Sequence, residues 1–263
     1  MNQFDHRPLG STGIHVSAIG LGTVKLGRNQ GVKYPSAFEL PSDAAAQALL
    51  ETARECGITL IDTAPAYGLS EERLGKLLGA GAHDWVICSK TGEEYINGSS
   101  HFDFSAAHTR ASVERSLKRL QRDWLDLVLV HSDGNDVDII ENSGAFEALG
   151  KLKQEGSIRA FGMSTKTVAG GILAARESDC VMVTYNPGHI EEQAVIDECL
   201  KLNKGVLLKK ALASGHLNSE DADPVQTCLD FAYAHAGVTS AIIGTINPQH
   251  LRDNIAKAKK ALT

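Results

Sequence analysis

A glycine joins a helix-like segment to a short run of β-branched residues at four separate places in this chain. The four junctions are ECGITLID, QEGSIRAFG, LNKGVLL and HAGVTSAII. Glycine adopts the left-handed conformation that ends a helix without steric cost. Between the junctions, as in residues 45–56, apolar side chains recur with the 3.6-residue period of a helix. A helix followed by a strand is therefore the repeating unit of the chain.

Short apolar runs predict eight strands that alternate with these helices. The runs lie at residues 16–22, 60–62, 86–90, 125–131, 158–164, 181–185, 206–210 and 241–244. Near-continuous apolar strands between helices are typical of a parallel sheet that helices cover. Eight such units predict a (β/α)8 barrel, the TIM barrel, with a short N-terminal β-hairpin. With 43% apolar residues in 263, the chain suits one such domain over residues 1–263.

The alternative to a barrel is an open, doubly wound sheet. That fold uses five or six strands, and its glycine-rich first turn leads directly into a helix. The first turn here is GLGTVKLG, in which Gly20 and Gly22 precede a long loop at 25–41. Helix signals begin only at Ser42, so the barrel is favoured.

Charge and composition exclude several classes of partner. The formal net charge is -6, and no run of Lys and Arg follows a nucleic-acid backbone or an anionic membrane. No apolar stretch approaches the roughly 18 residues of a membrane helix, and the first residues are polar, so we expect a cytoplasmic protein. The five cysteines are widely spaced and form no C-x-x-C pair, which argues against disulfides and against a metal site.

Reactive side chains stand at the ends of three predicted strands. Asp62, Lys90 and His131 end their runs, and Tyr67 follows shortly after Asp62. In a barrel these strand ends converge at one mouth. A lysine ammonium can tune a tyrosine hydroxyl toward a useful general acid, a carboxylate can hold that lysine, and a histidine can orient a carbonyl group. With no evident nucleophile, this set needs a hydride from a nicotinamide cofactor.

Each of the four residues also has an ordinary structural explanation. Asp62 could cap backbone groups, Tyr67 could be a packed aromatic, and His131 could be a hydrogen-bonded core histidine. Lys90 is harder to explain, because a lysine that ends an apolar strand must extend to solvent or be paired. Four reactive types at converging strand ends favour function over packing.

The segments IDTAPAYG, CSKTG and LDLVLVH resemble the aldo-keto reductase family, as do RPLGSTGIHVSAIGLGT near the start and GTINPQHLRDNI near the end. The resemblance spans essentially the whole chain. It implies a (β/α)8 barrel, NADPH as the usual cofactor with NADH as the alternative, and a catalytic tetrad of Asp62, Tyr67, Lys90 and His131. The tyrosine would donate the proton to the reduced carbonyl.

Barrel and family together indicate where a cofactor would bind. Phosphates commonly bind near the last two strands and a helix N-terminus, here after Asn247-Pro248, whose free N–H groups would face a phosphate. Only one of the adjacent residues Lys209 and Lys210 should face the cofactor. His250 stands where the family has arginine, and Arg252 or a lysine of the seventh strand could replace that charge. The expected cofactor-binding residues are Gly22, Thr23, Asp62, Ser164, Thr165, Tyr185, Lys209, Lys210, Gly244, Thr245, His250 and Asn254.

The leading functional hypothesis is a reversible NAD(P)H-dependent oxidoreductase that reduces aldehydes or ketones to alcohols. A cofactor-sensing regulatory subunit and a different barrel enzyme, such as an isomerase or a lyase, are the alternatives. We expect a small-molecule carbonyl substrate and a monomer or weak homo-oligomer. The polar composition of residues 92–103 predicts a long loop over the active-site face. This loop is either a gate for the substrate or a flexible surface loop without a role in the reaction.

Overall fold

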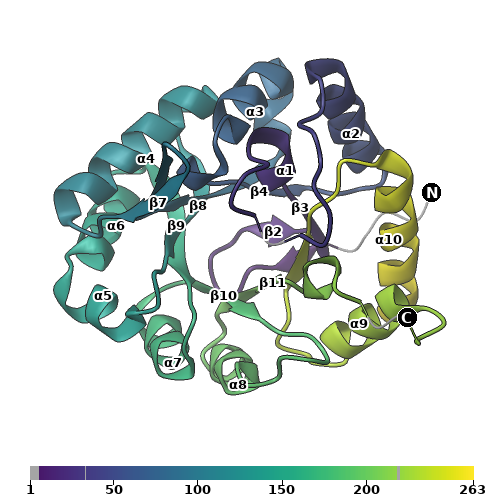
Figure 1. The fold of residues 1–263 in the computed structure, drawn as a ribbon. Helices are drawn as coiled ribbons and strands as arrows, with labels where there is room; N and C mark the ends of the chain where they lie inside the picture. The colour runs from purple at the N-terminus through teal and green to yellow at the C-terminus, as the bar shows by residue number, and fades with distance from the viewer. Residues whose placement is uncertain (1–5, 33, 218–219) are drawn as a thin grey trace.

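The computed structural model describes residues 6–32, 34–217 and 220–263, and its centre is a closed parallel barrel of eight strands (Figure 1). Going round the barrel, the strands are β3 (Ile19–Gly22), β4 (Leu60–Asp62), β5 (Val86–Thr91), β8 (Leu125–His131), β9 (Ile158–Ser164), β10 (Cys180–Thr184), β11 (Gly205–Lys209) and β12 (Ser240–Ile243). The prediction of a (β/α)8 barrel is confirmed.

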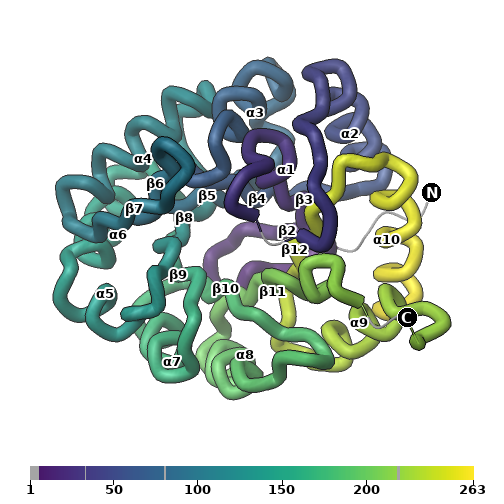
Figure 2. The backbone as a smooth tube through the Cα atoms, in the orientation of Figure 1, coloured from purple at the N-terminus to yellow at the C-terminus, as the bar shows by residue number. Residues whose placement is uncertain are grey.

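Helices connect successive strands on the outside of the barrel. They are α1 (Val24–Gly27), α2 (Asp43–Glu55), α3 (Ser70–Leu78), α4 (Ala106–Leu120), α5 (Asp136–Asn142), α6 (Ala145–Gln154), α7 (Val168–Glu177), α8 (Gln193–Lys201), α9 (Pro224–Tyr233) and α10 (Pro248–Ala261). Short 3-10 turns are η1 (Pro65–Tyr67), η2 (Gly79–Asp84) and η3 (Ala213–Gly215). The chain goes round once, so that α10 returns beside α2 (Figure 2).

Local sequence explains where these helices begin. Ser42 caps α2 by accepting a hydrogen bond from the backbone N–H of Ala45, as its position in the sequence predicts. Ser105, Thr167 and Asp223 cap α4, α7 and α9 in the same way. The predicted loop at 25–41 is shorter than expected, because α1 occupies its first residues.

Two apolar layers hold the barrel together. One lies between the strands and the surrounding helices. The other fills the barrel interior, and its members are Leu9, Ile14, Val16, Leu60, Cys88, Leu127, Leu129, Ala160, Cys180, Met182 and Leu207. Where a strand gives two residues to the inner layer, as Leu127 with Leu129 and Cys180 with Met182, they are alternate residues, because side chains of a strand point to opposite faces in turn.

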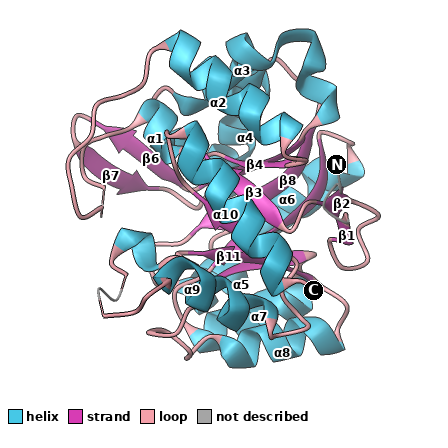
Figure 3. Ribbon diagram, turned by 90° about the vertical axis from the view of Figure 1, so that its right-hand side faces the viewer, coloured by secondary structure: helices cyan, strands magenta, loops and turns pink. Residues whose placement is uncertain are grey.

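Two antiparallel hairpins lie at opposite ends of the barrel (Figure 3). The first pairs β1 (Arg7–Pro8) with β2 (His15–Val16), and its Leu9, Ile14 and Val16 belong to the inner apolar layer. This confirms the N-terminal hairpin. It also divides the strand predicted at 16–22, since Val16 belongs to the hairpin and β3 starts at Ile19.

The second hairpin pairs β6 (Glu93–Ile96) with β7 (Ser99–Phe102). The prediction of a loop at residues 92–103 is therefore wrong. Asn97 and Gly98 form the connection, with φ of 51° and 84°, and Asn-Gly is the residue pair that tight hairpin turns prefer. The polar composition concealed a strand pair that packs against η1.

None of the helices in the described part of the chain has the length and apolar composition that crossing a bilayer requires.

Close helix packing makes Gly75 a sensitive position. A Cβ atom there would lie 2.0 Å from the carbonyl oxygen of Arg119, whereas a Cβ at Gly150 in α6 would meet nothing within 4 Å. We expect Gly75→Ala to lower the free energy of unfolding by about 2 kcal/mol through overpacking between α3 and α4. Gly150→Ala, the matched control, should raise it by up to ~1 kcal/mol through helix propensity. Urea unfolding measures both; equal effects would contradict this packing.

Candidate active site

On three strands, an apolar side chain that faces the barrel interior is followed, two residues later, by a polar side chain at the carboxyl end of the barrel. Two residues after Leu60 comes Asp62, and two residues after Cys88 comes Lys90. His131 follows Leu129 at the same interval. Since side chains two apart on a strand share a face, the same alternation that fills the core also directs these groups into the mouth.

Lys90 and Asp62 form a buried ion pair beneath the mouth. The Lys90 side chain is 1% exposed, and its Nζ lies 2.5 Å from Oδ1 of Asp62. It also donates a hydrogen bond to the backbone oxygen of Thr63, at 2.9 Å. Burial lowers the pKa of Lys90, but the charge of Asp62 and the nearby Tyr67 and Cys88 more than offset it, so the net shift is upward. The lysine is therefore a fixed positive charge.

Tyr67 lies directly over this pair. It ends η1, its hydroxyl is 3.4 Å from Oδ2 of Asp62, and the ammonium of Lys90 is 4.8 Å from its ring centroid. Burial raises the pKa of Tyr67 and Asp62 raises it further, while Lys90 lowers it. The net shift is upward. Lys90 acts on this hydroxyl in the direction that the sequence predicts, but burial and the carboxylate outweigh its effect on the pKa in the free protein.

His131 completes the group. Its ring is nearly perpendicular to the Tyr67 ring, with centroids 6.2 Å apart, and its side chain is 22% exposed. Nδ1 lies 2.7 Å from Oε2 of Glu93, although the approach lies away from the N–H direction and is an ion-pair contact rather than an aligned hydrogen bond. Burial lowers the pKa of His131, and Lys90 and Lys209 lower it further against an upward effect of Glu93.

All four predicted tetrad residues therefore meet at the mouth, together with one that sequence reasoning missed. Glu93 belongs to β6, inside the segment interpreted as a loop. The Asn-Gly pair at 97–98 was the available signal, since a hairpin there returns the chain across the active-site face.

Lys209, Ser164 and Thr165 form a second polar group beside the tetrad. Nζ of Lys209 donates to Oγ of Ser164 at 2.9 Å and also to the backbone oxygen of Thr165. Glu192 accepts a hydrogen bond from Oγ1 of Thr165 at 3.1 Å. Lys210 is exposed and has a positive φ, so only one of the two lysines bonds into this group, as the strand geometry predicts.

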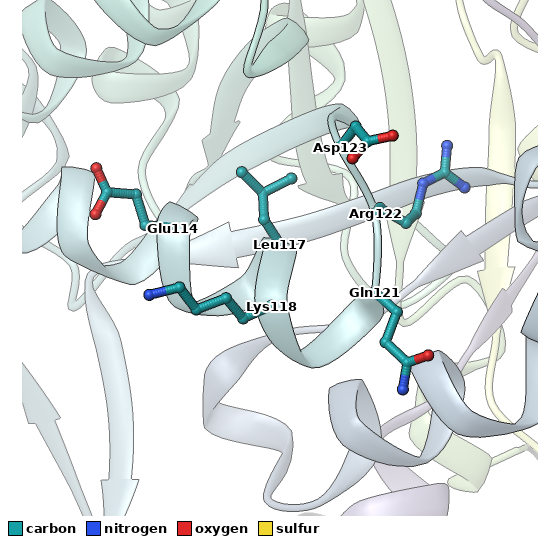
Figure 4. Close-up of a pocket in the computed structure, with 6 residues that line it drawn as sticks. All are labelled: Glu114, Leu117, Lys118, Gln121, Arg122 and Asp123. Carbon is teal, nitrogen blue, oxygen red and sulfur yellow. The ribbon is translucent and has the colours of Figure 1, made fainter.

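A cavity of about 350 Å³ adjoins this polar group. Its walls include Thr165, Thr184, Glu192, Lys209 and Lys210, so it opens at the carboxyl ends of β9, β10 and β11. A second hollow, of about 420 Å³, is drawn in Figure 4 and is lined by Glu114, Leu117, Lys118, Gln121, Arg122 and Asp123. It lies where α4 leads into the first residue of β8, at the opposite end of the barrel from the tetrad, so we do not assign the chemistry to it.

The region between β3 and β12 contains the remaining expected cofactor contacts. A Cβ at Gly22 would lie 3.5 Å from the backbone nitrogen of Gly244, so these strand ends are adjacent. The Thr23 hydroxyl donates to the backbone oxygen of Asp62 at 2.8 Å. Oγ1 of Thr245 accepts a hydrogen bond from the backbone nitrogen of Asn247.

Helix α10 begins at this region as predicted, but its N–H groups are not free. The Asn247 side chain accepts hydrogen bonds from the backbone nitrogens of Gln249 and His250. A phosphate would have to replace this cap. The His250 side chain is exposed, and Asn254 is half-buried on the same helix.

Two expected residues lie elsewhere. Tyr185 packs between the barrel and α9, with its ring centroid 4.7 Å from that of Phe231 and its hydroxyl donating to Gln193. It does not face the mouth, because its side chain lies on the same side of the chain as Val181 and Val183, toward the helices. Arg252 pairs with Glu55 of α2 at 2.8 Å, so its charge is directed away from the proposed phosphate region.

The comparisons with known proteins agree with this geometry. The model of the aldo/keto reductase family matches residues 18–224. The chain belongs to the aldo/keto reductase family. It is 34% identical over 292 residues to the uncharacterized oxidoreductase YqkF of Bacillus subtilis, covering 96% of this chain and 90% of that protein. A crystal structure of a Pseudomonas aeruginosa protein classed as an aldo-keto reductase superposes with a TM-score of 0.90 at 58% identity, over 98% and 96% of the two chains.

A third relative of this aldo/keto reductase is matched over part of its length. L-galactose dehydrogenase of Arabidopsis thaliana is 39% identical over 170 residues, which are 62% of this chain and 49% of that protein. Membership of the family makes the chain an oxidoreductase. Among the described residues, no group of three or more His, Cys, Asp or Glu side chains is placed to bind a metal ion.

Lys209 should be distinguishable from other lysines of this reductase by its titration. Burial lowers its pKa to about 8, although Glu192 opposes this shift. Below that pKa the amine is charged and unreactive, so competitive acetylation of Lys209 should rise through about pH 8. Mass spectrometry after digestion measures this, with the exposed Lys118 as the reference. A midpoint for Lys209 near its ordinary value of 10.5 would contradict the environment described.

Proposed function

We propose that this chain is a cytoplasmic, NADPH-dependent reductase that converts aldehydes or ketones to alcohols reversibly, with Tyr67 as general acid. The observation that carries the proposal is the convergence of Tyr67, the Lys90–Asp62 ion pair and His131 at one barrel mouth. Family membership supports the reaction class, and the geometry supports these roles.

The residues present fit a nicotinamide cofactor. The mouth offers an acid, a fixed cation and an orienting imidazole, but none of these side chains can deliver a hydride. When bound, the nicotinamide supplies that hydride. Ser164, Thr165 and Lys209 would hold it on one side, and Gly22, Gly244 and Thr245 would admit it on the other. The conversion therefore needs a cofactor of this type, and the family generally uses one.

Tyr67 donates the proton at the carbonyl oxygen. When the carbonyl carbon gains a hydride, its π electrons move to oxygen, and the hydroxyl proton of Tyr67 forms the alcohol. An alkoxide is a stronger base than a phenolate, so this transfer is favourable even though the pKa of Tyr67 is raised. Lys90 stabilises the phenolate left behind, Asp62 holds Lys90 in place, and His131 orients the carbonyl oxygen.

Substrate, compartment and assembly belong to the same proposal. We place the chain in the cytoplasm because all five cysteines are free thiols, as a reducing compartment maintains them. A small-molecule carbonyl is the expected substrate, without nucleic-acid or membrane partners, and we propose a monomer or weak homo-oligomer. The dehydrogenase among the relatives is a reason to assay sugar oxidation as well as carbonyl reduction.

The regulatory-subunit alternative keeps cofactor binding but lacks turnover. The complete tetrad speaks against it, and rapid reduction of a good carbonyl substrate would exclude it. An isomerase or lyase would bind neither nicotinamide cofactor, so one binding titration separates that alternative from the reductase.

Tyr67→Phe should abolish turnover while preserving cofactor binding. The substitution removes the proton donor and keeps the ring over Lys90, so kcat should fall at least ~10³-fold, in the range of general-acid effects. Calorimetric titration should give an NADPH affinity within about threefold of wild type, far less than one tenfold step. Retained turnover would assign the acid role to another residue.

His250→Arg should strengthen NADPH binding and leave NADH binding unchanged. A guanidinium at the start of α10 can pair with a 2′-phosphate, and a hydrogen bond to a charged group contributes ~1.5 kcal/mol or more, about tenfold in affinity. Titration of both cofactors with wild type and variant measures the effect. An equal gain for both cofactors would show that position 250 does not contact that phosphate.

A further inference from the structure

The hairpin at the mouth places a carboxylate on the histidine of the tetrad. Glu93 is the first residue of β6, and its Oε2 lies 2.7 Å from Nδ1 of His131. This contact lies on the side of the imidazole away from Nε2, which has no hydrogen-bond partner among the residues that the structure describes. The ring therefore has one nitrogen engaged by the hairpin and one left for a ligand.

The position of Glu93 is fixed by its other oxygen. Oε1 accepts a hydrogen bond from the Ser100 hydroxyl at 2.6 Å and lies 3.9 Å from the guanidinium of Arg28. Arg28 itself donates to the backbone oxygen of Ala66, next to Tyr67, and stacks 3.4 Å from the ring centroid of Tyr95. These contacts use Oε1 and leave Oε2 for His131, so the carboxylate has one defined orientation.

This arrangement determines which nitrogen of His131 carries hydrogen. A neutral imidazole has one N–H and one lone pair. A carboxylate oxygen 2.7 Å from Nδ1 favours hydrogen on that nitrogen over a lone pair, because the polarised N–H attracts the negative charge even though the contact is not an aligned hydrogen bond. Nε2 of the neutral ring then carries the lone pair. A carbonyl oxygen can only accept a hydrogen bond, so Nε2 can serve it only when the ring is the imidazolium, which has both hydrogens.

We propose that Glu93 is a positioning residue for carbonyl reduction, which fixes His131 with hydrogen on Nδ1 and so makes the imidazolium its reduction-competent form. This inference rests on the proposed function, because it assigns a state to a residue of the same site. The groups that face His131 are Glu93 from β6, Tyr67 from η1, Lys90 from β5 and Lys209 from β11.

The charges around the pair set the direction of the pH dependence. Burial raises the pKa of Glu93, but the contact with His131, the hydrogen bond from Ser100 and the charge of Arg28 together lower it to about 2. Glu93 is therefore ionised at every working pH. The pKa of His131 lies below its usual 6.5, mainly through burial. The imidazolium is therefore lost as the pH rises toward neutrality, and carbonyl reduction should slow over that range.

The first test is the pH dependence of kcat/KM for reduction of an aldehyde. Wild type should lose about tenfold per pH unit above the pKa of His131, as expected for one essential proton. In Glu93→Gln the amide can donate to Nδ1, which allows a neutral ring with hydrogen on Nε2. The decline should then flatten to less than about threefold over the same range. Glu93→Asp, which keeps the charge, should restore the decline.

The matched control is Glu94→Gln, the same substitution at the next position of the hairpin. Glu94 pairs with Arg115 and lies 3.5 Å from His108, so it faces α4 rather than the mouth. The pH dependence of kcat/KM in Glu94→Gln should match that of wild type. If Glu94→Gln flattens the profile as Glu93→Gln does, the effect comes from loosening the hairpin and the proposal is wrong.

The second test does not depend on activity. Nitrogen NMR of ¹⁵N-histidine-labelled protein without cofactor reports which ring nitrogen carries hydrogen, and His131→Asn assigns the signal. We expect hydrogen on Nδ1 in neutral wild type and a shift toward Nε2 in Glu93→Gln. Hydrogen on Nε2 in neutral wild type would overturn the proposal even in an active reductase. If the chain reduced no carbonyl, this spectrum would still test the pair, so the two failures are distinguishable.

Discussion

The ion pair between Lys90 and Asp62 is the interaction on which the mouth of the barrel depends. Both groups are buried, and removing one partner of such a pair typically costs ~3–5 kcal/mol because the other charge is left without compensation. The pair can form only if β4 and β5 end in register, where Asp62 lies opposite Cys88. Lys90 also donates to Thr63, at the start of the turn that carries Tyr67. The position of Tyr67, the proposed proton donor, therefore follows from a structural requirement of the core.

Much of this arrangement was predictable because the side chains of a strand point to opposite faces in turn, so that every second residue faces the same side. Apolar side chains at alternate positions of a strand define the barrel interior. A polar residue that continues this alternation at the carboxyl end of the strand must then lie at the mouth. Leu60 with Asp62 and Leu129 with His131 show this pattern in the sequence itself. The glycine junctions identified the helix-to-strand units, so the order of elements and the tetrad were visible without coordinates.

The remaining differences have identifiable physical causes. Tyr185 was assigned to the mouth because it stands at the end of a predicted strand, but alternation puts it on the same face as Val181 and Val183, toward the helices. The Asn-Gly turn at 97–98 was a local signal, but the placement of its hairpin depends on Arg28 and Arg115, which lie far away in sequence. The charge balance at Tyr67 also required structure, because burial has no counterpart in a residue pattern.

Burial and charge at the mouth favour the protonated form of the Tyr67 hydroxyl. The raised pKa of Tyr67 keeps its hydroxyl protonated, which is the form that reduction requires and alcohol oxidation does not. Lys90 and Lys209 place positive charge near the carboxyl ends of β5 and β11, while Asp62 pairs with Lys90 and Glu93 contacts His131. Each carboxylate is thus engaged by a neighbouring side chain of the mouth, which leaves the lysine charges and the protonated Tyr67 as the groups that the proposed reduction would use.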